Sequence, residues 1–369
     1  MIRRLPERRS HPAAGPRARI ADVAREAGVS KAAVSFAFNS PERLSGETVA
    51  RIRGVAEVLG YRPHPVARML TARQTSTVGI LTPQSLADVF GNPFFALFSE
   101  GVAAVTEERG FGLLFISPLH GSLERALARA TVDGVVVVGL EEDHPEVTAI
   151  RQAGLPTVIV DAAAWEEHGA VSVDDEGGAR AAAEHLISQG HRDLLVISIG
   201  PADSGPALSP GGIVGRRLHG YGQALEAAGI DLPEGRIVAA PATFEGGEQA
   251  FLAAWADGLR PTGVLAMSDS IAIGVLQAAR HLGLRVPADL SVVGFDDLPI
   301  SRLTDPPLTT VHQPVRRKGE EAARLLLARI AGVAVGKEAH RVFGTRLVVR
   351  RSTAPPGARR STAPPGARA

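Results

Sequence analysis

A short stretch near the N-terminus, residues 30–39 (SKAAVSFAFN), carries side chains that could form hydrogen bonds with a nucleic acid. Its apolar spacing predicts a helix with Ser30 as the N-cap. The side chains that would face away from the protein are Lys31, Ala32, Ser35, Phe36 and Asn39. Small, polar and basic residues on an exposed helix can contact base edges and phosphates in the major groove. For Phe36 two roles stay open: contact with a thymine methyl group, or packing on its own domain.

Other patterns that could do chemistry are weak. The segment GVAVGKE (332–338) lacks the spacing of a phosphate-binding loop, and no G-x-G-x-x-G follows an expected strand. The segment EEDHPE (141–146) is the densest group of possible metal ligands, but we expect an acidic surface loop there. The chain has no cysteine, which excludes disulfides and thiol nucleophiles. We therefore expect no enzyme, no cofactor and no metal site.

The elements around residues 30–39 predict a helix-turn-helix. A preceding helix is indicated by an apolar stripe, and Gly28 fits its end, where a positive φ is needed. The stripe consists of Ile20, Val23, Ala24 and Ala27. A third helix is predicted with Ser45 as its N-cap and a buried stripe of Val49, Ile52, Val55, Ala56 and Leu59. Two short helices joined by a tight turn, with a third to pack on, are typical of DNA-binding heads.

The distribution of charge agrees with that prediction. The net charge of the 369 residues is +1, but residues 1–75 hold 14 Lys and Arg against 6 Asp and Glu. The remainder holds 26 against 33. A basic block on an acidic body is expected of a nucleic-acid-binding head attached to a separate module. No secretory signal or membrane span is found, so we expect a cytoplasmic protein.

From residue 77 the sequence predicts α/β architecture. Continuous β-branched runs separated by helical stretches indicate parallel strands that are buried on both faces. One series comprises 77–82, 113–117, 134–139 and 156–160, and a second comprises 171–173, 194–199, 263–267 and 290–295. Two series predict two tandem doubly wound subdomains, which bind ligands outside the carboxyl ends of their strands.

Several motifs, in this order, resemble those of the LacI/GalR family of bacterial transcription regulators, from about residue 18 to 352. They include DVAREAGVS, VSFAFN, GYRPHPVARML, NPFF, DGVVVVG, HLISQGHRDLLVI, SVVGFDD and PPLTTVHQP. The resemblance implies an all-α helix-turn-helix head and a periplasmic-binding-protein-like core of two parallel-sheet lobes. It also implies a hinge helix whose Leu70 enters the minor groove, with His64 and Arg68 as further DNA contacts.

The same resemblance implies a pocket for a sugar-like effector between the two lobes. By position its residues are Phe94, Phe95 and Asp161 from one lobe and Arg217, Phe244 and Asp269 from the other. Charged groups can bind vicinal hydroxyls, and a Phe ring can cover the apolar face of a sugar. We expect Asp296 and Asp297 to be turn residues instead of ligand contacts.

The expected division of the chain follows. Residues 1–17 form a disordered basic arm, 18–62 the head, 63–75 the hinge, 76–350 the core and 351–369 a disordered repeat tail. The N-lobe is predicted at about 76–173 and 304–334, and the C-lobe at about 174–303 and 335–350.

The resemblance implies a homodimeric repressor, with a tetramer not excluded, that a sugar-like effector releases from double-stranded operator DNA. A regulator that uses its ligand as corepressor, an activator, and a sugar-binding protein without DNA function stay open as alternatives.

Overall fold

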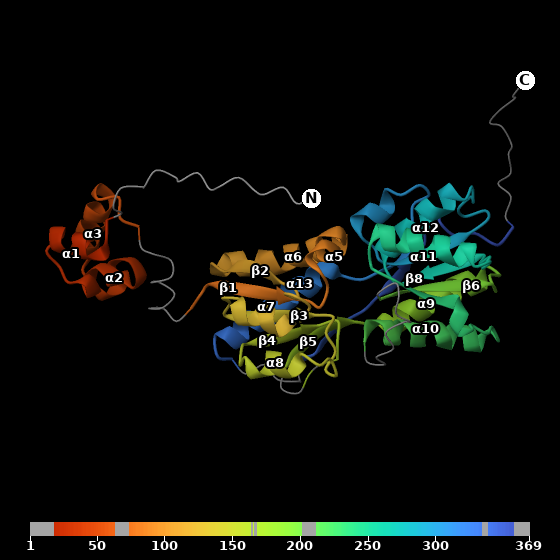
Figure 1. Ribbon diagram of the computed structural model, residues 1–369, viewed down its shortest axis with the longest axis horizontal. Helices are drawn as coiled ribbons and strands as arrows, with labels where there is room; N and C mark the ends of the chain where they lie inside the picture. Colours follow the sequence, from red (N-terminus) through yellow and green to blue (C-terminus); the bar gives the residue numbers. More distant parts are fainter. Residues whose placement is uncertain are drawn as a thin grey trace, which may run out of the picture. The chain divides into compact units, whose positions relative to one another are not determined.

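The structure, a computed structural model, describes residues 18–62, 74–163, 165, 168–200, 212–333 and 339–357. These belong to two compact units, Met1–Thr75 and Ser76–Ala369, which are described separately here (Figure 1). The predicted basic arm 1–17 and the hinge residues His64, Arg68 and Leu70 lie outside the described residues.

The first unit is a small helical head. Its elements are α1 (Ile20–Glu26), α2 (Lys31–Asn39), the 3-10 helix η1 (Pro41–Arg43) and α3 (Gly46–Val58). Gly28 has a φ of +65° between α1 and α2, and Ser30 and Ser45 cap α2 and α3 by accepting backbone hydrogen bonds. The core contains Val23, Ala24, Ala27, Val34, Ala37, Ile52 and Ala56. Leu59, predicted to be buried, is instead the exposed C-cap of α3, one residue past the last helical turn.

The N-lobe of the second unit is a six-stranded parallel sheet in the order β11-β5-β4-β3-β1-β2. The strands are β1 (Thr77–Leu81), β2 (Gly112–Ile116), β3 (Gly134–Val138), β4 (Thr157–Val160), β5 (Gly169–Val173) and β11 (Arg341–Phe343). Its helical elements are α5 (Leu86–Gly91), α6 (Pro93–Thr106), η2 (Glu107–Arg109), α7 (Leu123–Arg129), α8 (Val147–Gln152) and α13 (Val315–Ile330).

Two pairs of helices cover the faces of this sheet. Side chains of α6 and α13 share one apolar core with the strands, and side chains of α7 and α8 share another. Helices α6 and α13 cross at very short distance, which the glycines at the crossing permit. A Cβ on Gly101 would meet the carbonyl of Arg316, and a Cβ on Gly319 would meet the carbonyl of Phe98. This crossing positions two groups of the candidate site, the start of α6 and Lys318 of α13.

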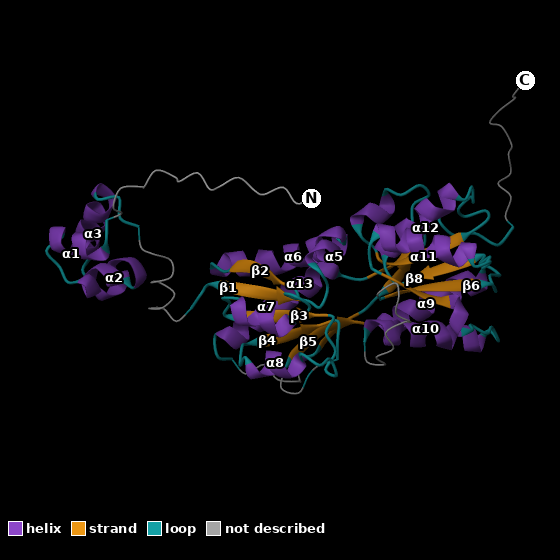
Figure 2. Cartoon of the chain, in the orientation of Figure 1, coloured by secondary structure: helices purple, strands orange, loops and turns teal. Residues whose placement is uncertain are grey.

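The C-lobe is a second six-stranded sheet in the order β12-β10-β9-β8-β6-β7, in which the described strand pairs are parallel except β10–β12. Helices cover both faces of this sheet (Figure 2). Its strands are β6 (Leu194–Ile199), β7 (Ile237–Ala240), β8 (Gly263–Ala266), β9 (Ser291–Asp296), β10 (Thr309–His312) and β12 (Arg346–Val348). Its helical elements are α9 (Asp175–Ser188), α10 (Ile213–Ala227), η3 (Glu234–Arg236), α11 (Phe244–Ala256), α12 (Asp269–His281) and η4 (Pro299–Arg302). Helices α9 and α10 share one apolar core with the strands, and α11 and α12 the other.

The lobes exchange strands in a way that differs from the predicted boundaries. Strand β5 pairs with β4 of the first sheet, which agrees with the predicted N-lobe bounds of 76–173, although its run was grouped with the second series. Residues 304–334 were assigned to the N-lobe, yet β10 pairs with β9 of the C-lobe. Residues 335–350 were assigned to the C-lobe, yet β11 pairs with β5 of the N-lobe. The reason is that a strand's sheet is fixed by its lateral hydrogen-bonding partners, which periodicity along the chain does not reveal.

Residues 351–357 also differ from the prediction of a disordered tail. Ser352 is fully buried: its Oγ donates to the carbonyl of Val292 at 2.6 Å and accepts from the amide of Thr309 at 2.8 Å. The carbonyl of Ala354 accepts from Ser291 Oγ at 3.0 Å and lies 3.0 Å from Nε2 of His191. The segment is ordered because the C-lobe satisfies its polar groups, although its Pro/Gly-rich composition suggests a linker.

Candidate functional site

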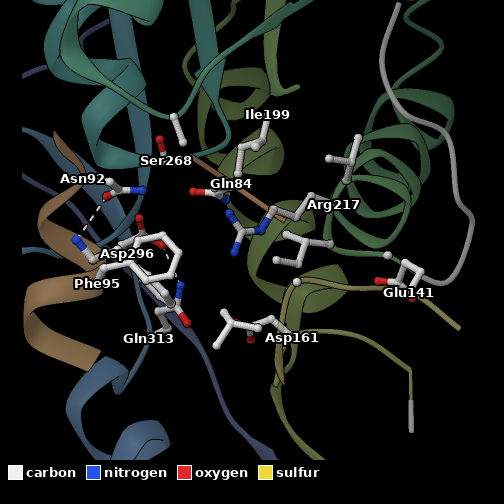
Figure 3. Close-up of a pocket in the computed structure, with 17 residues that line it drawn as sticks. Gln84, Asn92, Phe95, Glu141, Asp161, Ile199, Arg217, Ser268, Asp296 and Gln313 are labelled. Atoms are coloured by element: carbon white, nitrogen blue, oxygen red, sulfur yellow. Dashed lines mark hydrogen bonds between the residues drawn. The ribbon is translucent and has the colours of Figure 1, made fainter. Parts of the chain in front are cut away.

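A cavity of about 220 Å³ lies between the two lobes of the core (Figure 3). Its walls come from both sheets, at the carboxyl ends of the strands, where doubly wound folds bind ligands. The N-lobe contributes Gln84, Asn92, Phe94, Phe95, Val138, Gly139, Glu141 and Asp161. The C-lobe contributes Ile199, Gly212, Ile213, Val214, Arg217, Ala242, Ser268 and Asp296, and Gln313 follows β10 at the crossing to the N-lobe.

One wall of the cavity is aromatic. Asn92 is the N-cap of helix α6, and its Oδ1 accepts a hydrogen bond from the amide of Phe94 at 3.0 Å. Phe94 and Phe95, the second and third residues of the helix, both line the cavity. The Phe94 ring stands edge-on to Phe95, with centroids 5.5 Å apart, and lies parallel to Phe98. Packed aromatic rings present a fixed apolar surface, which is what the carbon face of a sugar ring requires.

A buried network of charged and amide groups forms the base of the cavity. The Nζ of Lys318 donates to both carboxylate oxygens of Asp161, at 2.7 and 2.6 Å, and to Oε1 of Gln313 at 2.6 Å. The amide nitrogen of Gln313 in turn donates to Oδ1 of Asp296 at 2.5 Å. Each of these four side chains therefore has at least one hydrogen-bond partner, as buried polar groups require. The remaining oxygen of Asp296 is available to a ligand hydroxyl.

Arg217 of α10 enters the cavity from the C-lobe. Its Nε donates to Oδ1 of Asp175 at 2.9 Å, and its Nη1 donates to the carbonyl of Met267. The guanidinium carbon lies 3.5 Å from the centroid of the Phe295 ring. These contacts hold the side chain in one orientation and leave Nη2 without a hydrogen bond to the described residues. In Figure 3 the guanidinium points into the cavity, so Nη2 can donate to a ligand.

The electrostatics of the site follow from burial. Burial alone would raise the pKa of Asp175, but the positive charges of Arg217 and Arg216 hold it below its ordinary value. Burial raises the pKa of Asp296 to about 6, against the opposing charge of Arg217. Burial also raises the pKa of Glu141 at the edge of the cavity. Shifted pKa values in a cleft are typical of a functional site.

Two cavity residues have unusual backbone conformations. Asp161 follows β4 with a φ of 60°, and Asp296 ends β9 with a φ of 125°. Non-glycine residues rarely adopt such angles, and strain of this kind collects at binding sites. Asp296 was expected to be a turn residue instead of a ligand contact; it ends β9, and its carboxylate also lines the cavity. Asp297 does not line it; its carboxylate binds His312 at 3.0 Å and also contacts Arg350.

Four of the six expected pocket residues line the cavity, and two do not. Phe94, Phe95, Asp161 and Arg217 are in its walls, whereas Phe244 and Asp269 are absent from them. The Asp269 carboxylate turns into the C-lobe, where it accepts from the amide of Leu298 at 2.7 Å, from Ser301 Oγ at 2.6 Å and from Thr310 Oγ1. Its neighbour Ser268 and the residue Ala242 take the places expected of Asp269 and Phe244.

Other cavity residues were missed by sequence reasoning. Glu141 belongs to a segment expected to be an acidic surface loop, yet it is half-buried and lines the cavity. Gln84, Asn92 and Gln313 are neutral residues at strand or helix ends. Only their position in the sequence could have indicated that they line the cavity, because each follows or precedes a regular element near the carboxyl end of a strand. Within the described ranges, no group of three or more His, Cys, Asp and Glu could hold a metal ion.

The head presents the outward face of α2 that the sequence predicted. Ser30, Lys31, Ala32 and Asn39 are exposed and Ser35 is half-buried, while Val34 and Ala37 point into the core. Phe36 is half-buried on the same outward side, and the guanidinium of Arg43 lies over its ring. Asn39 donates to Ser35 Oγ at 3.2 Å. Among the described residues, no helix has both the length and the apolar character needed to cross a membrane.

Comparison with known proteins matches both units. The family model "Bacterial regulatory proteins, lacI family" matches residues 19–64, and a model of a periplasmic binding protein-like domain matches residues 183–353. The HTH-type transcriptional regulator CelR of Thermobifida fusca is 33% identical over 337 residues, which cover 89% of this chain and 96% of CelR.

Solved structures agree in fold. A transcriptional regulator CelR–cellobiose complex has a TM-score of 0.65 at 32% identity, with 91% of this chain and all of that chain covered. A Lac repressor dimer bound to operator and an anti-inducer has a TM-score of 0.74 at 25% identity, with 92% and 100% covered.

A helix-turn-helix head followed by a two-lobed core with a cleft defines a DNA-binding transcriptional regulator, not an enzyme. The chain belongs to the lacI family of bacterial regulatory proteins.

Proposed function

We propose that this chain is a cytoplasmic, homodimeric transcriptional repressor and that a small sugar in the cavity between its lobes releases it from operator DNA. The composition of the cavity is the observation that supports a sugar as the effector. A rigid pair of Phe rings lies in one wall, and donors and acceptors from both lobes surround the same space. An apolar face opposite a few fixed polar groups suits a neutral polyhydroxylated ring.

The polar groups available to the ligand support a neutral sugar. Lys318 and Asp161 neutralise each other, so neither leaves a net charge to be matched by the ligand. Nη2 of Arg217 can donate to one hydroxyl, and the free oxygen of Asp296 can accept from another. Both of these groups belong to the C-lobe, whereas Phe94 and Phe95 of the N-lobe can cover the apolar face of the same sugar. A sugar thus contacts both lobes at once, and a ligand of this kind favours the closed arrangement of the cleft.

Two hydrogen bonds between described residues cross the cleft and would respond to such closure. Ser270 Oγ of α12 donates to Oδ1 of Asn92 at 3.3 Å, and Nη2 of Arg216 donates to the carbonyl of Asp161 at 3.3 Å. A ligand can change DNA affinity only by its different affinities for two arrangements of the core. We propose that closure alters the spacing of the two heads of a dimer.

On the DNA side, the proposed contacts are those of the outward face of α2, namely Ser30, Lys31, Ala32, Ser35, Phe36 and Asn39. His64, Arg68 and Leu70 are proposed as hinge contacts. Replacing Leu70 with Ala should weaken operator binding and leave non-specific, phosphate-driven binding nearly unchanged, because the phosphates are contacted elsewhere.

The test is binding of the full chain to DNA from its own upstream region, measured by fluorescence anisotropy with and without a panel of monosaccharides and disaccharides. We expect tight binding that at least one neutral sugar weakens. A sugar that strengthens binding would make the ligand a corepressor. A chain that binds sugar but no DNA at any salt concentration would be a sugar-binding protein instead. A fragment of residues 76–369 should retain sugar binding and lose DNA affinity.

A further inference from the structure

The contact between Arg43 and Phe36 is the most informative feature of the head outside its expected contacts. Arg43 is the last residue of η1, directly after α2, and its guanidinium carbon lies 5.0 Å from the centroid of the Phe36 ring. Phe36 sits on the outward face of α2, half-buried, while its neighbours Val34 and Ala37 fill the core. The ring therefore lies under a cation at the edge of the face that meets DNA.

Within residues 18–62, the guanidinium of Arg43 has no polar partner, in contrast to those of Arg25 and Arg53. Arg25 forms an ion pair with Asp22 at 2.9 Å, and Arg53 Nη2 donates to the carbonyl of Ala37 at 3.2 Å. Arg43 is exposed, and no carboxylate or carbonyl of the described head accepts from its guanidinium. Its five N–H donors are available to a ligand outside the protein.

The backbone that carries Arg43 is fixed. The amide of Arg43 donates to the carbonyl of Ser40 at 3.1 Å, and that of Leu44 donates to the carbonyl of Pro41 at 3.1 Å. Leu44 also packs against the apolar core of the head. The backbone hydrogen bonds fix the Cα of Arg43, and the Phe36 ring holds its guanidinium. The methylene groups between these two points therefore have little conformational freedom.

We propose that Arg43 is a DNA-contacting residue of this regulator and that Phe36 is its positioning residue. The ligand chemistry is a pair of acceptors that matches the fork of a guanidinium, such as O6 and N7 of a guanine or two oxygens of a phosphate. The inference rests on the DNA-binding function of the head. It assigns to Phe36 a role that neither thymine contact nor simple core packing describes.

The energetic advantage lies in preorganisation. An arginine loses rotamer freedom when it docks on DNA, and this loss weakens binding. A ring that already holds the guanidinium by a cation–π contact reduces that loss. Loss of the ring should therefore weaken binding less than loss of the arginine.

The test compares operator binding by the full-length protein and its variants. Arg43→Ala should weaken binding by roughly 10- to 150-fold, the range for loss of hydrogen bonds from a charged group. Phe36→Leu should weaken it roughly 2- to 10-fold, and the double variant should be no weaker than Arg43→Ala. Phe36→Tyr keeps the aromatic face and should restore most of the affinity. Arg25→Ala removes the same charge from an ion pair on α1 and is the matched control.

Two further measurements identify the acceptor and keep the outcomes distinct. If Arg43 binds a phosphate, the slope of log K against log salt should fall by about 0.9 and all sequences should weaken alike. If it binds guanine, one position of the operator should lose its preference. Binding by Arg43→Ala within twofold of wild type overturns the proposal, as do additive effects of the two single changes. Failure of the wild-type protein to bind its operator would instead contradict the function itself.

Discussion

Lys318 and Asp161 form an ion pair that is sealed inside the core, with Nζ 2.6 and 2.7 Å from the two carboxylate oxygens and the lysine side chain fully buried. The two residues come from α13 and the end of β4. The same ammonium donates to Gln313, which follows β10 and donates to Asp296 of β9. One buried cation thus connects the N-lobe, a crossing between the lobes and the C-lobe.

Replacing Lys318 with Met should be strongly destabilising. The substitution leaves the Asp161 carboxylate and the Gln313 carbonyl oxygen in the interior without a donor. Breaking a buried ion pair by removing one partner costs about 3–5 kcal/mol in the free energy of unfolding. Urea denaturation, followed by circular dichroism, measures the loss.

Two companion variants separate the ion pair from general effects on α13. Lys318→Met combined with Asp161→Asn should recover much of the loss, because no unpaired charge remains. Arg324→Ala, on the exposed side of the same helix, should change the free energy of unfolding by less than about 0.5 kcal/mol. Equal losses in the single and double variants would count against the ion pair as the cause.

Arg217→Ala should weaken sugar binding by roughly 10- to 150-fold, because a hydrogen bond from a charged group to the ligand is lost. Operator affinity without sugar should be retained, so the variant should bind DNA and fail to release it. Calorimetry with the sugar identified in the anisotropy screen measures the first quantity, and an anisotropy titration of operator DNA measures the second.

The control addresses the structural role of Arg217, which also holds Asp175. In Arg217→Ala the Asp175 carboxylate keeps its ion pair with Arg216, so the free energy of unfolding should fall by less than in Lys318→Met, while sugar binding is still lost. Arg180→Ala, an exposed change on α9, should leave both titrations unchanged. Wild-type sugar affinity in the single variant would remove Arg217 from the site.

The sequence predicted the local elements well because their signals are local. Apolar spacing around Val23 and Val34, with Gly28 between them, was sufficient for the head. The runs of β-branched residues likewise predicted the buried strands. The exchange of β10 and β11 between the lobes was not predictable in this way, because sheet membership depends on hydrogen bonds to distant strands.

The cavity was predictable in place but less so in detail. Asp161, Asp269 and Asp296 all follow or end buried strands, and sequence alone does not say where each carboxylate turns. Asp269 finds three donors inside the C-lobe and turns away from the cleft, whereas Asp296 turns toward it. The partners that decide this, Leu298, Ser301 and Thr310, lie more than two dozen residues away in the sequence.

The core should lose stability as the pH rises from 6.5 to 8.5. Burial, together with the charge of Asp296, raises the pKa of Asp269 to about 8. A group whose pKa is higher in the folded protein stabilises it below the unfolded pKa and loses that contribution as the pH rises through the folded value. The expected effect is at most about a tenfold change in the folding equilibrium per pH unit. The pH dependence of urea denaturation measures it.

The pH window and one variant isolate Asp269. Burial lowers the pKa of His185, His191 and His340 below the ordinary 6.5, so all three are largely neutral above pH 7.5 in either state and the decline from pH 7.5 to 8.5 is free of their titration. Asp269→Asn imitates the protonated acid, since its carbonyl can accept from Leu298 and Ser301 while its amide donates to Thr310. This variant should flatten the decline between pH 6.5 and 8.5. An unchanged slope would mean that another group titrates there.

The nine-residue repeat RSTAPPGAR at 351–359 and 360–368 allows a test of the docked tail in which the two copies serve as their own control. In the first copy, Ser352, Thr353 and Ala354 exchange hydrogen bonds with β9, β10 and α9.

Ending the chain after Arg350 removes these bonds and exposes the groups that faced them. At about 1 kcal/mol for each net hydrogen bond, the free energy of unfolding should fall by about 2–4 kcal/mol. Ending it after Arg359 keeps the first copy and should leave stability unchanged. Ser352→Ala in the full chain should reproduce part of the loss, because the amide of Thr309 and the carbonyl of Val292 both lose their partner. If both truncated chains are as stable as the full chain, residues 351–369 contribute nothing to the C-lobe. If both lose the same stability, the loss is due to the second copy and the hydrogen bonds of the first copy are not its cause.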